Sequence, residues 1–243
     1  MTAKRPRRTA ERILDATLAL FNRFGEPNVS TSQLCAEMGI SPGNLFYHHP
    51  TRDALIAGLF ARYGAELDTA MAEALSAQAV TRWPAASPAL NRLEILCDAL
   101  AHTAWAYRFL FRDLSDLVSR QRVLEEAMPA LLGRQAEALE RALRALQWSP
   151  DSTPVNDTVI RLWAGHMLAS LTGSTGLDGA LDPREHRRDT EVQAVERATS
   201  RAVGLVQPCL ASPDREVLGA HLALPEQLGS DPWGLSAQAW SRP

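Results

Sequence analysis

One stretch, residues 30–52 (STSQLCAEMGISPGNLFYHHPTR), constrains the fold of this chain more than any other. Ser30 and Gln33 have the spacing of a capping box, in which each side chain accepts a hydrogen bond from the other residue's backbone N–H. A helix is therefore predicted to start at Ser30. Gly39 is predicted to end it, because glycine readily adopts the left-handed conformation that closes a helix.

A second short helix is predicted directly after the first. Ser41 supplies another N-cap, and Pro42 suits the first helical position because its missing N–H has no partner within the helix in any case. Two short helices joined by a glycine-containing turn form a helix-turn-helix, whose second helix enters the DNA major groove. The sequence thus predicts a DNA-reading element.

The first two turns of this second helix carry the side chains expected to contact DNA, while Leu45 is expected to point inward. The candidates are Pro42, Gly43, Asn44, Tyr47 and His48. Asn44 has the amide needed for a bidentate contact with adenine, and Tyr47 and His48 suit phosphate oxygens. Gly43 would let the helix approach the DNA backbone closely. A plain polar surface helix is the alternative interpretation.

The stretch GISPGNLFYHHPTRDALI resembles the signature of the TetR family of one-component transcriptional regulators. That signature has a small residue and Gly before a Leu-aromatic pair, then His, then a basic residue that opens the next helix. With the preceding helix, the resemblance covers residues 9–62. It implies that Thr31, Ser32 and Arg52 also contact phosphates.

Two positions depart from the family pattern. Phe46 stands where the family usually has a phosphate-binding Tyr, and the neighbouring Tyr47 points about 100° further round the helix. His49 stands where the family usually has a core Phe. A half-buried histidine needs a hydrogen-bond partner, so we expect a satisfied structural histidine, with a pH-sensitive head as the alternative.

The charge distribution agrees with one end of the chain facing a polyanion. Residues 1–62 carry eight Lys and Arg against five Asp and Glu, a net charge of +3, whereas the remainder carries −6. Neutralisation of phosphates supplies most non-specific affinity for DNA. Within the basic arm (residues 1–8), Lys4 to Arg8 are expected to be disordered in the free protein, and such an arm can reach phosphates or the minor groove. A solvated basic tail is the alternative.

The rest of the chain shows helical periodicity and no alternating strand pattern, so the predicted fold class is all-α. We expect a three-helix DNA-binding domain with a helix-turn-helix (residues 1–52), a larger helical regulatory, ligand-binding and dimerisation domain (53–212) and an irregular C-terminal tail (213–243). Helices are predicted over 9–24, 51–78, 89–104, 105–118, 128–148, 155–172 and 191–210, with a short one to about residue 222. Residues 173–176 (GSTG) are predicted to stop a helix, and residues 177–188 to form a loop.

The resemblance also implies a partner and a mode of regulation. The last two long helices of this family form an intersubunit four-helix bundle, so residues 155–172 and 191–210 are expected to make a homodimer. The expected function is that of a repressor, which binds a palindromic double-stranded DNA operator and is released by a small-molecule inducer. Packing within one chain is the alternative for these helices.

The inducer pocket is expected between helices of the body, where ligands of helical bundles usually lie. The candidates share aromatic, histidine or methionine side chains, and they suggest a partly apolar or aromatic effector. They are His102, Trp105, Phe109, Trp163, His166 and Met167. Such aromatic stripes are also compatible with an ordinary apolar core.

Other function classes find less support in the sequence. Cys35, Cys97 and Cys209 are odd in number and far apart, which disfavours a disulfide framework or a metal site and favours a reducing compartment. Without a signal-like or membrane-spanning apolar run, we expect a cytoplasmic protein. No cofactor motif is present, so no cofactor is expected. A metal- or redox-responsive regulator, or an all-α enzyme using His102, His166 and Asp98, are the alternatives.

Overall fold

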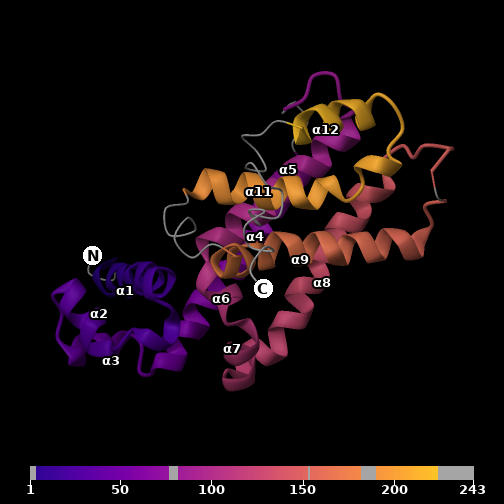
Figure 1. The fold of residues 1–243 in the computed structure, drawn as a ribbon. Helices are drawn as coiled ribbons and strands as arrows, with labels where there is room; N and C mark the ends of the chain where they lie inside the picture. Colours follow the sequence, from indigo (N-terminus) through magenta and orange to yellow (C-terminus); the bar gives the residue numbers. More distant parts are fainter. Residues whose placement is uncertain (1–3, 77–81, 153, 182–189, 224–243) are drawn as a thin grey trace, which may run out of the picture. The chain divides into compact units, whose positions relative to one another are not determined.

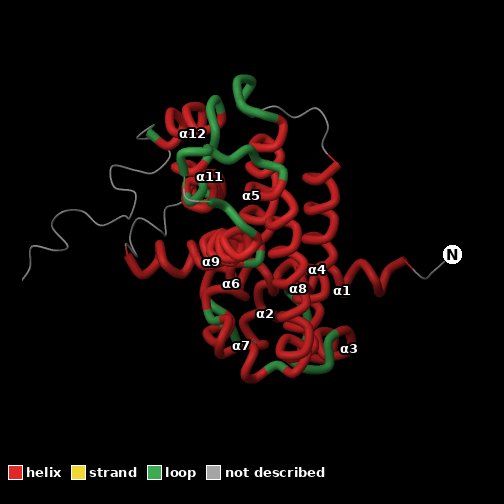
Figure 2. The backbone as a smooth tube through the Cα atoms, turned by 90° about the vertical axis from the view of Figure 1, so that its right-hand side faces the viewer, coloured by secondary structure: helices red, strands yellow, loops and turns green. Residues whose placement is uncertain are grey.

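The structure is a computed structural model that describes residues 4–76, 82–152, 154–181 and 190–223. These residues are folded almost entirely into helices, and no β-strand occurs among them (Figure 2). The all-α prediction is therefore confirmed. In the described part of the chain, none of the helices combines the length and apolar character that crossing a bilayer requires.

The chain divides into two compact units, residues 1–66 with 107–129 (unit 1) and residues 67–106 with 130–243 (unit 2). Helices α4 and α8 contribute residues to both units (Figure 1). Unit 1 contains the helices of the N-terminal third and two short helices from the middle of the chain. They are α1 (Lys4–Phe24), η1 (Glu26–Asn28), α2 (Thr31–Met38), α3 (Pro42–His48), the first part of α4 (Arg52–Ser76), α6 (Arg108–Arg112) and α7 (Leu114–Arg120), and the start of α8 also belongs to this unit.

Unit 2 contains longer helices that pack on one another. They are the end of α4, α5 (Pro88–Ala106), most of α8 (Arg122–Arg144), α9 (Asp157–Leu181), α11 (Glu191–Gly204), η2 (Gln207–Cys209) and α12 (Asp214–Leu222). Helix α11 packs on both α5 and α9, and these two also contact each other (Figure 1). Their facing sides bury Leu93, Leu100, Met167 and Val203 completely or almost so.

The core of unit 1 joins α2 and α3 to α1, α4 and α6. Ile13 of α1, Leu34 of α2, Leu45 of α3 and Leu59 of α4 are all at most 2% exposed. Burying such side chains stabilises a fold by about 1.5–3 kcal/mol each, so these residues fix how α2 and α3 lie on α1.

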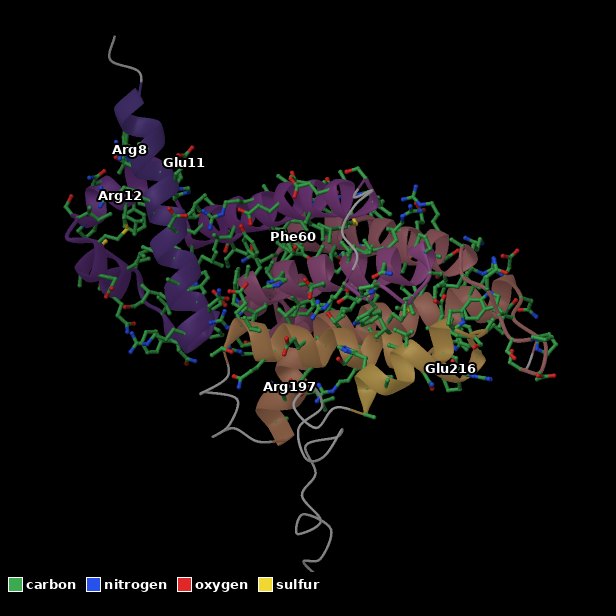
Figure 3. All side chains as sticks on the ribbon, turned by 90° about the horizontal axis from the view of Figure 1, so that it is seen from above. Arg8, Glu11, Arg12, Phe60, Arg197 and Glu216 are labelled. Carbon is green, nitrogen blue, oxygen red and sulfur yellow. The ribbon has the colours of Figure 1, made fainter. Side chains whose placement is uncertain are left out.

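Helix α1 begins at Lys4, so the expectation of a disordered arm over residues 4–8 is wrong. Pro6 lies in the first turn, where the backbone N–H groups have no intrahelical partner, and arginine is a good helix former. The exposed side chains of Arg8 and Arg12 project from one side of α1, one turn apart, and Glu11 projects from the other (Figure 3). Residues 4–8 of the basic arm are therefore part of α1.

Residues 105–118 do not form the single helix that their periodicity predicts. Helix α5 continues to Ala106, and Tyr107 and Asp113 adopt non-helical dihedral angles that separate α6 and α7. The backbone N–H of Phe109 donates to the side-chain oxygen of Asn22 on α1 (3.1 Å). This contact joins residues that are far apart in the sequence, so local periodicity does not predict it.

Two further helix boundaries differ from the prediction. Helix α8 begins at Arg122 instead of Met128, with Pro129 inside it. Helix α9 continues through residues 173–176 to Leu181, because helical glycines lower stability but do not forbid a helix. Residues 177–181 are thus helical, and the remainder of the predicted loop, 182–189, lies outside the described residues.

The C-terminal part also differs in extent. Helix α11 ends at Gly204 instead of Leu210, and a 3-10 turn with Pro208 follows. The short helix near residue 222 is confirmed as α12. The expectation of an irregular tail from residue 224 onward concerns residues outside the described part.

Candidate nucleic-acid interface

Helix α2 starts and ends as its sequence predicts. The Gln33 backbone N–H donates to Ser30 Oγ (3.1 Å), and the Ser30 backbone N–H donates to Gln33 Oε1 (3.3 Å), so the capping box is complete. Gly39 has φ 63° and ψ 36°, a left-handed conformation that side-chain-bearing residues rarely adopt. These local interactions set the length of α2 and the turn that follows.

Helix α3 is held at its start and on one face. Ser41 Oγ accepts from the Asn44 backbone N–H (3.2 Å), and Pro42 is the first helical residue. Leu45 is completely buried, whereas Pro42 and Asn44 are exposed. A seven-residue helix with one buried anchor presents the rest of its surface outward, and this is the geometry that a major-groove reading helix needs.

The outward face of α3 centres on Gly43 and Tyr47, which lie one turn apart. Tyr47 is 77% exposed and Phe46 is 44% exposed. A side chain at Gly43 would meet only Ser41 Oγ, at 4.0 Å, so nothing in the protein itself requires a glycine there. The rings of Tyr47 and His48 meet edge to face with centroids 5.0 Å apart, and His48 is half-buried.

The first turn of α2 carries Thr31 and Ser32, the two small residues predicted to contact phosphate. Thr31 is half-buried and Ser32 is exposed. Both belong to the N-terminal turn of a helix, whose free backbone N–H groups attract phosphate.

Arg52, predicted to contact phosphate, makes an extensive set of contacts within the protein. Its guanidinium donates to the Glu26 carboxylate (2.5 Å), to the Val29 carbonyl (2.5 Å) and to the Glu26 carbonyl. Glu26 is 1% exposed and also accepts from Arg120 Nη2 of α7 (3.1 Å). The buried carboxylate thus joins the start of α4 to the α1–α2 connection and to α7.

Sequence reasoning missed Glu26. A glutamate followed by Pro27 and Asn28 has the composition of an exposed turn, and acidic residues are rarely buried without a partner. Its partners Arg52 and Arg120 are distant in the sequence. No local signal identifies such a group.

His49 follows α3 and is half-buried against α1. Its Nε2 lies 3.3 Å from the Ala10 carbonyl oxygen, which supplies the partner that a structural histidine requires. Burial lowers the pKa of His49 from its ordinary value, the contact with Ala10 raises it in part, and the neighbouring His48 lowers it further. The imidazole is therefore held mainly in its neutral form at neutral pH.

Unit 2 contains a separate cavity of about 670 Å³, a size suited to a small organic ligand. It lies between α9, α11 and α12, and its walls are mostly apolar. They include Ala169 and Leu177 of α9, Leu205 directly after α11 and Leu222 of α12, with Arg201 of α11 as a charged group.

Among the six sequence-predicted ligand residues, His166 lines this cavity. Met167 is completely buried on the same helix, and the ring of Trp163 packs against Trp148 with centroids 5.3 Å apart. Periodicity placed Trp163 and Met167 on one face of α9, but that face meets the core and Trp148.

The three predicted ligand residues between positions 102 and 109 do not line this cavity. His102 is exposed, with Nδ1 3.1 Å from a Glu191 carboxylate oxygen. Trp105 is half-buried near the end of α5. Phe109 is completely buried in unit 1, where its ring packs 5.3 Å from that of Phe21.

A short helix pair with two caps, a buried anchor and an exposed second helix defines a helix-turn-helix DNA-binding domain. Two family models match the chain and identify the family to which this domain belongs. The model for the N-terminal part of bacterial regulatory proteins of the tetR family matches residues 13–59, and the TetR model, described as a bacterial transcriptional repressor, matches residues 62–218. The chain belongs to the TetR family of transcriptional regulators.

Solved structures of similar fold agree with this assignment. A TetR-family regulator from Marinobacter aquaeolei VT8 is 21% identical, with a TM-score of 0.69 over 88% of this chain and 97% of that one. A putative transcriptional regulator from Saccharomonospora viridis, solved with choline, is 16% identical, with a TM-score of 0.59 over 84% and 99%. A transcriptional regulator from Rhodococcus sp. Rha1 is 17% identical, with a TM-score of 0.59 over 84% and 100%. No curated protein matches the sequence.

Proposed function

We propose that this regulator is a repressor that binds a palindromic operator as a homodimer and leaves it when a small molecule binds in the helical body. The observation that carries the proposal is the exposed face of α3, held by the Ser41 cap and the buried Leu45. A repressor of this kind works in the cytoplasm, where its operator is.

A base contact is proposed for Asn44 of α3, whose amide donates and accepts at the edge of an adenine. Pro42 and Gly43 allow close approach to DNA, and Tyr47 and His48 contact phosphate oxygens. The predicted phosphate contacts are Thr31 and Ser32 at the start of α2 and Arg52 at the start of α4. Arg52 keeps 32% of its side chain exposed, although Glu26 and Val29 accept from its guanidinium.

Dimerisation is proposed through residues 155–172 and 191–210. Leu162 of α9 is 55% exposed and Val192 of α11 is 60% exposed, so both offer apolar surface that a partner would cover. The exposed Gly165 and Ala169 lie on the same side of α9 as Leu162 and would allow close approach of a second helix. A dimer would present two copies of α3 to half-sites roughly one helical turn, about 34 Å, apart.

Release by a small molecule follows if the ligand binds better to a conformation that does not fit the operator, since only differential binding shifts such an equilibrium. The cavity in unit 2 has a suitable size, but seven of its eleven lining residues belong to the stretches proposed for the dimer. The similar regulator solved with choline supports ligand binding by proteins of this fold.

The test is fluorescence anisotropy with DNA from upstream of the regulator's own gene, at moderate salt. We expect saturable, sequence-dependent binding. Asn44→Ala is expected to weaken specific binding by about 1–3 kcal/mol. Its affinity for unrelated DNA, which depends on phosphate contacts, should change little. Equal affinity of the wild-type protein for the operator and for unrelated DNA would refute the proposal.

A further inference from the structure

Glu26 is a buried acid next to a residue that is expected to contact DNA. Its side chain is 1% exposed, and its carboxylate accepts from Arg52 Nε (2.5 Å) and from Arg120 Nη2 (3.1 Å). Arg52, the first residue of α4, is one of the proposed phosphate contacts. Well-packed apolar side chains often stabilise a fold as well as a buried ion pair does. Stability alone therefore does not account for a charged residue at position 26.

The Arg52 guanidinium is fixed in both position and orientation. Besides its contact with the Glu26 carboxylate, it donates to the carbonyl oxygens of Val29 (2.5 Å) and of Glu26. Its central carbon lies over the ring of Phe21, 5.3 Å from the ring centroid, and Phe21 is 1% exposed. A planar guanidinium with an acceptor at each nitrogen and a buried ring against one face has little freedom to rotate.

These contacts leave part of the guanidinium available to DNA. They use three N–H groups, one on each nitrogen, whereas a guanidinium has five. The other two belong to the terminal nitrogens, and 32% of the Arg52 side chain is exposed. Arginine suits phosphate because its N–H groups lie in one rigid plane. A guanidinium that is already held in place binds a phosphate without first losing side-chain entropy.

Arg120 of α7 fixes the carboxylate itself. Its Nη2 lies 3.1 Å from Glu26 Oε2, whereas Arg52 binds Oε1. Arginines at both oxygens define the plane of the carboxylate, so the Glu26 side chain cannot turn away from Arg52. Asp116, on the same helix as Arg120, accepts from Arg120 Nη2 (2.6 Å) and holds that side chain in turn.

We propose that Glu26 is a positioning residue for DNA binding, which holds the Arg52 guanidinium at the place where an operator phosphate meets it. Glu26 does not touch DNA and acts through Arg52. This inference rests on the proposed function, because it requires that Arg52 contacts a phosphate. The competing role for Glu26 is purely structural, that of joining three segments of unit 1.

The probe is operator DNA in which single phosphates are replaced by neutral methylphosphonates, with binding measured by fluorescence anisotropy. Such a change in the DNA cannot unfold the protein. Replacing the phosphate that faces Arg52 is expected to weaken binding of the wild-type protein about tenfold, as loss of one hydrogen bond between charged groups does. The same replacement should cost Arg52→Met less than about twofold, which identifies the phosphate. If no phosphate behaves in this way, the inference fails.

Glu26→Gln then tests the positioning role. It keeps the size of the side chain and the backbone carbonyl that Arg52 also uses, but it removes the charge that aligns the guanidinium. The cost of the methylphosphonate at the identified phosphate is expected to fall from about tenfold to less than about threefold. A purely structural role would weaken binding of both DNAs by the same factor. A cost that stays at about tenfold would therefore overturn the proposal.

Glu126→Gln is the matched control. It removes the same charge from unit 1, but Glu126 is paired with Arg122 at an exposed position of α8. The methylphosphonate should cost this variant about as much as it costs the wild-type protein. Loss of any acidic residue raises the general attraction for DNA, and the control measures that contribution. An equal fall in Glu26→Gln and Glu126→Gln would assign the effect to net charge and refute the positioning role.

Binding of the unmodified operator distinguishes this inference from the proposed function. Sequence-dependent binding, together with a methylphosphonate cost that Glu26→Gln leaves unchanged, keeps the repressor proposal and refutes the positioning role. Equal affinity of the wild-type protein for the operator and for unrelated DNA refutes both.

Discussion

The Arg52 guanidinium lies 2.5 Å from the Glu26 carboxylate, and the two residues join the start of α4 to the connection between α1 and α2. Arg120 of α7 binds the other carboxylate oxygen of Glu26, at 3.1 Å. A single buried carboxylate therefore holds three segments of unit 1 together.

Glu26→Gln is expected to destabilise unit 1. It leaves the Arg52 guanidinium without a counter-charge, while Arg120 keeps its ion pair with Asp116 (2.6 Å). Both arginines are partly exposed, so solvent reduces the loss to about 1–2 kcal/mol. Urea denaturation of the full chain measures it. The matched control is Glu126→Gln, which removes an exposed carboxylate paired with Arg122 and should have almost no effect. Equal effects of the two substitutions would contradict a special role for Glu26.

Gly43→Ala is expected to raise the stability of the fold and to lower its affinity for operator DNA. Alanine in a helix is more stable than glycine by roughly 0.5–1 kcal/mol, and at position 43 the added methyl group meets no close neighbour in the protein. The same methyl group would stand between α3 and DNA, so operator affinity should fall while stability rises. Gly133→Ala on α8 is the control, since it should raise stability alone. Unchanged operator affinity in Gly43→Ala would remove this position from the interface.

Substitutions at Ser41 test whether its cap positions α3. Ser41→Ala removes the acceptor for the Asn44 backbone N–H and should cost about 1 kcal/mol. Ser41→Asp restores a good cap, and thereby the stability, but places a negative charge next to the proposed phosphate contacts. We expect thermal denaturation to show lower stability for Ser41→Ala and restored stability for Ser41→Asp. Operator binding should be weak for both variants. Full operator affinity in Ser41→Asp would argue against DNA contact at the start of α3.

His49 should make stability depend on pH. Its pKa is lower in the folded protein than in the unfolded chain, so the unfolded chain binds the proton more readily. Its contribution to stability is complete above the ordinary histidine pKa and is lost as the pH falls through about 6.5 toward the lowered value. His49→Phe removes the titrating group, so the difference in melting temperature between the two proteins should grow from pH 8 to pH 5. A constant difference would show that His49 does not titrate between folded and unfolded states.

Leu162→Glu should dissociate the proposed dimer. A charge placed in an interface core costs several kcal/mol when it has no partner, and Leu162 is 55% exposed in the single chain, so folding should be unaffected. Sedimentation velocity gives the oligomeric state. Val123→Glu on α8 is the control, because Val123 is 51% exposed but lies outside the proposed interface. A dimer that survives Leu162→Glu would place the interface elsewhere.

Structural features that depend on residues close together in the sequence were predictable. Features that depend on contacts between residues far apart in the sequence were not. Ser30, Gly39 and Ser41 act within four residues, so their caps and turn follow from the sequence. The break after α5 involves Asn22, some 87 positions from Phe109, and periodicity cannot detect it.

The same distinction between local and long-range contacts explains which site residues could be predicted from the sequence. Leu45 and the exposed face of α3 follow from helix geometry alone, because a short helix has one inward side. The cavity combines α9, α11 and α12, so its lining depends on how three helices pack. The glycines at 173 and 176 predict the end of a helix, whereas α9 continues through them and Gly173 lines the cavity.

The way α3 is attached has a consequence for engineering. Its fold depends on Ser41 and Leu45, and the outward positions Gly43, Asn44 and Tyr47 contribute little to stability. A combinatorial library restricted to those three codons would therefore yield mostly folded variants. Selection from it could change which operator is recognised while the framework that presents the helix stays the same.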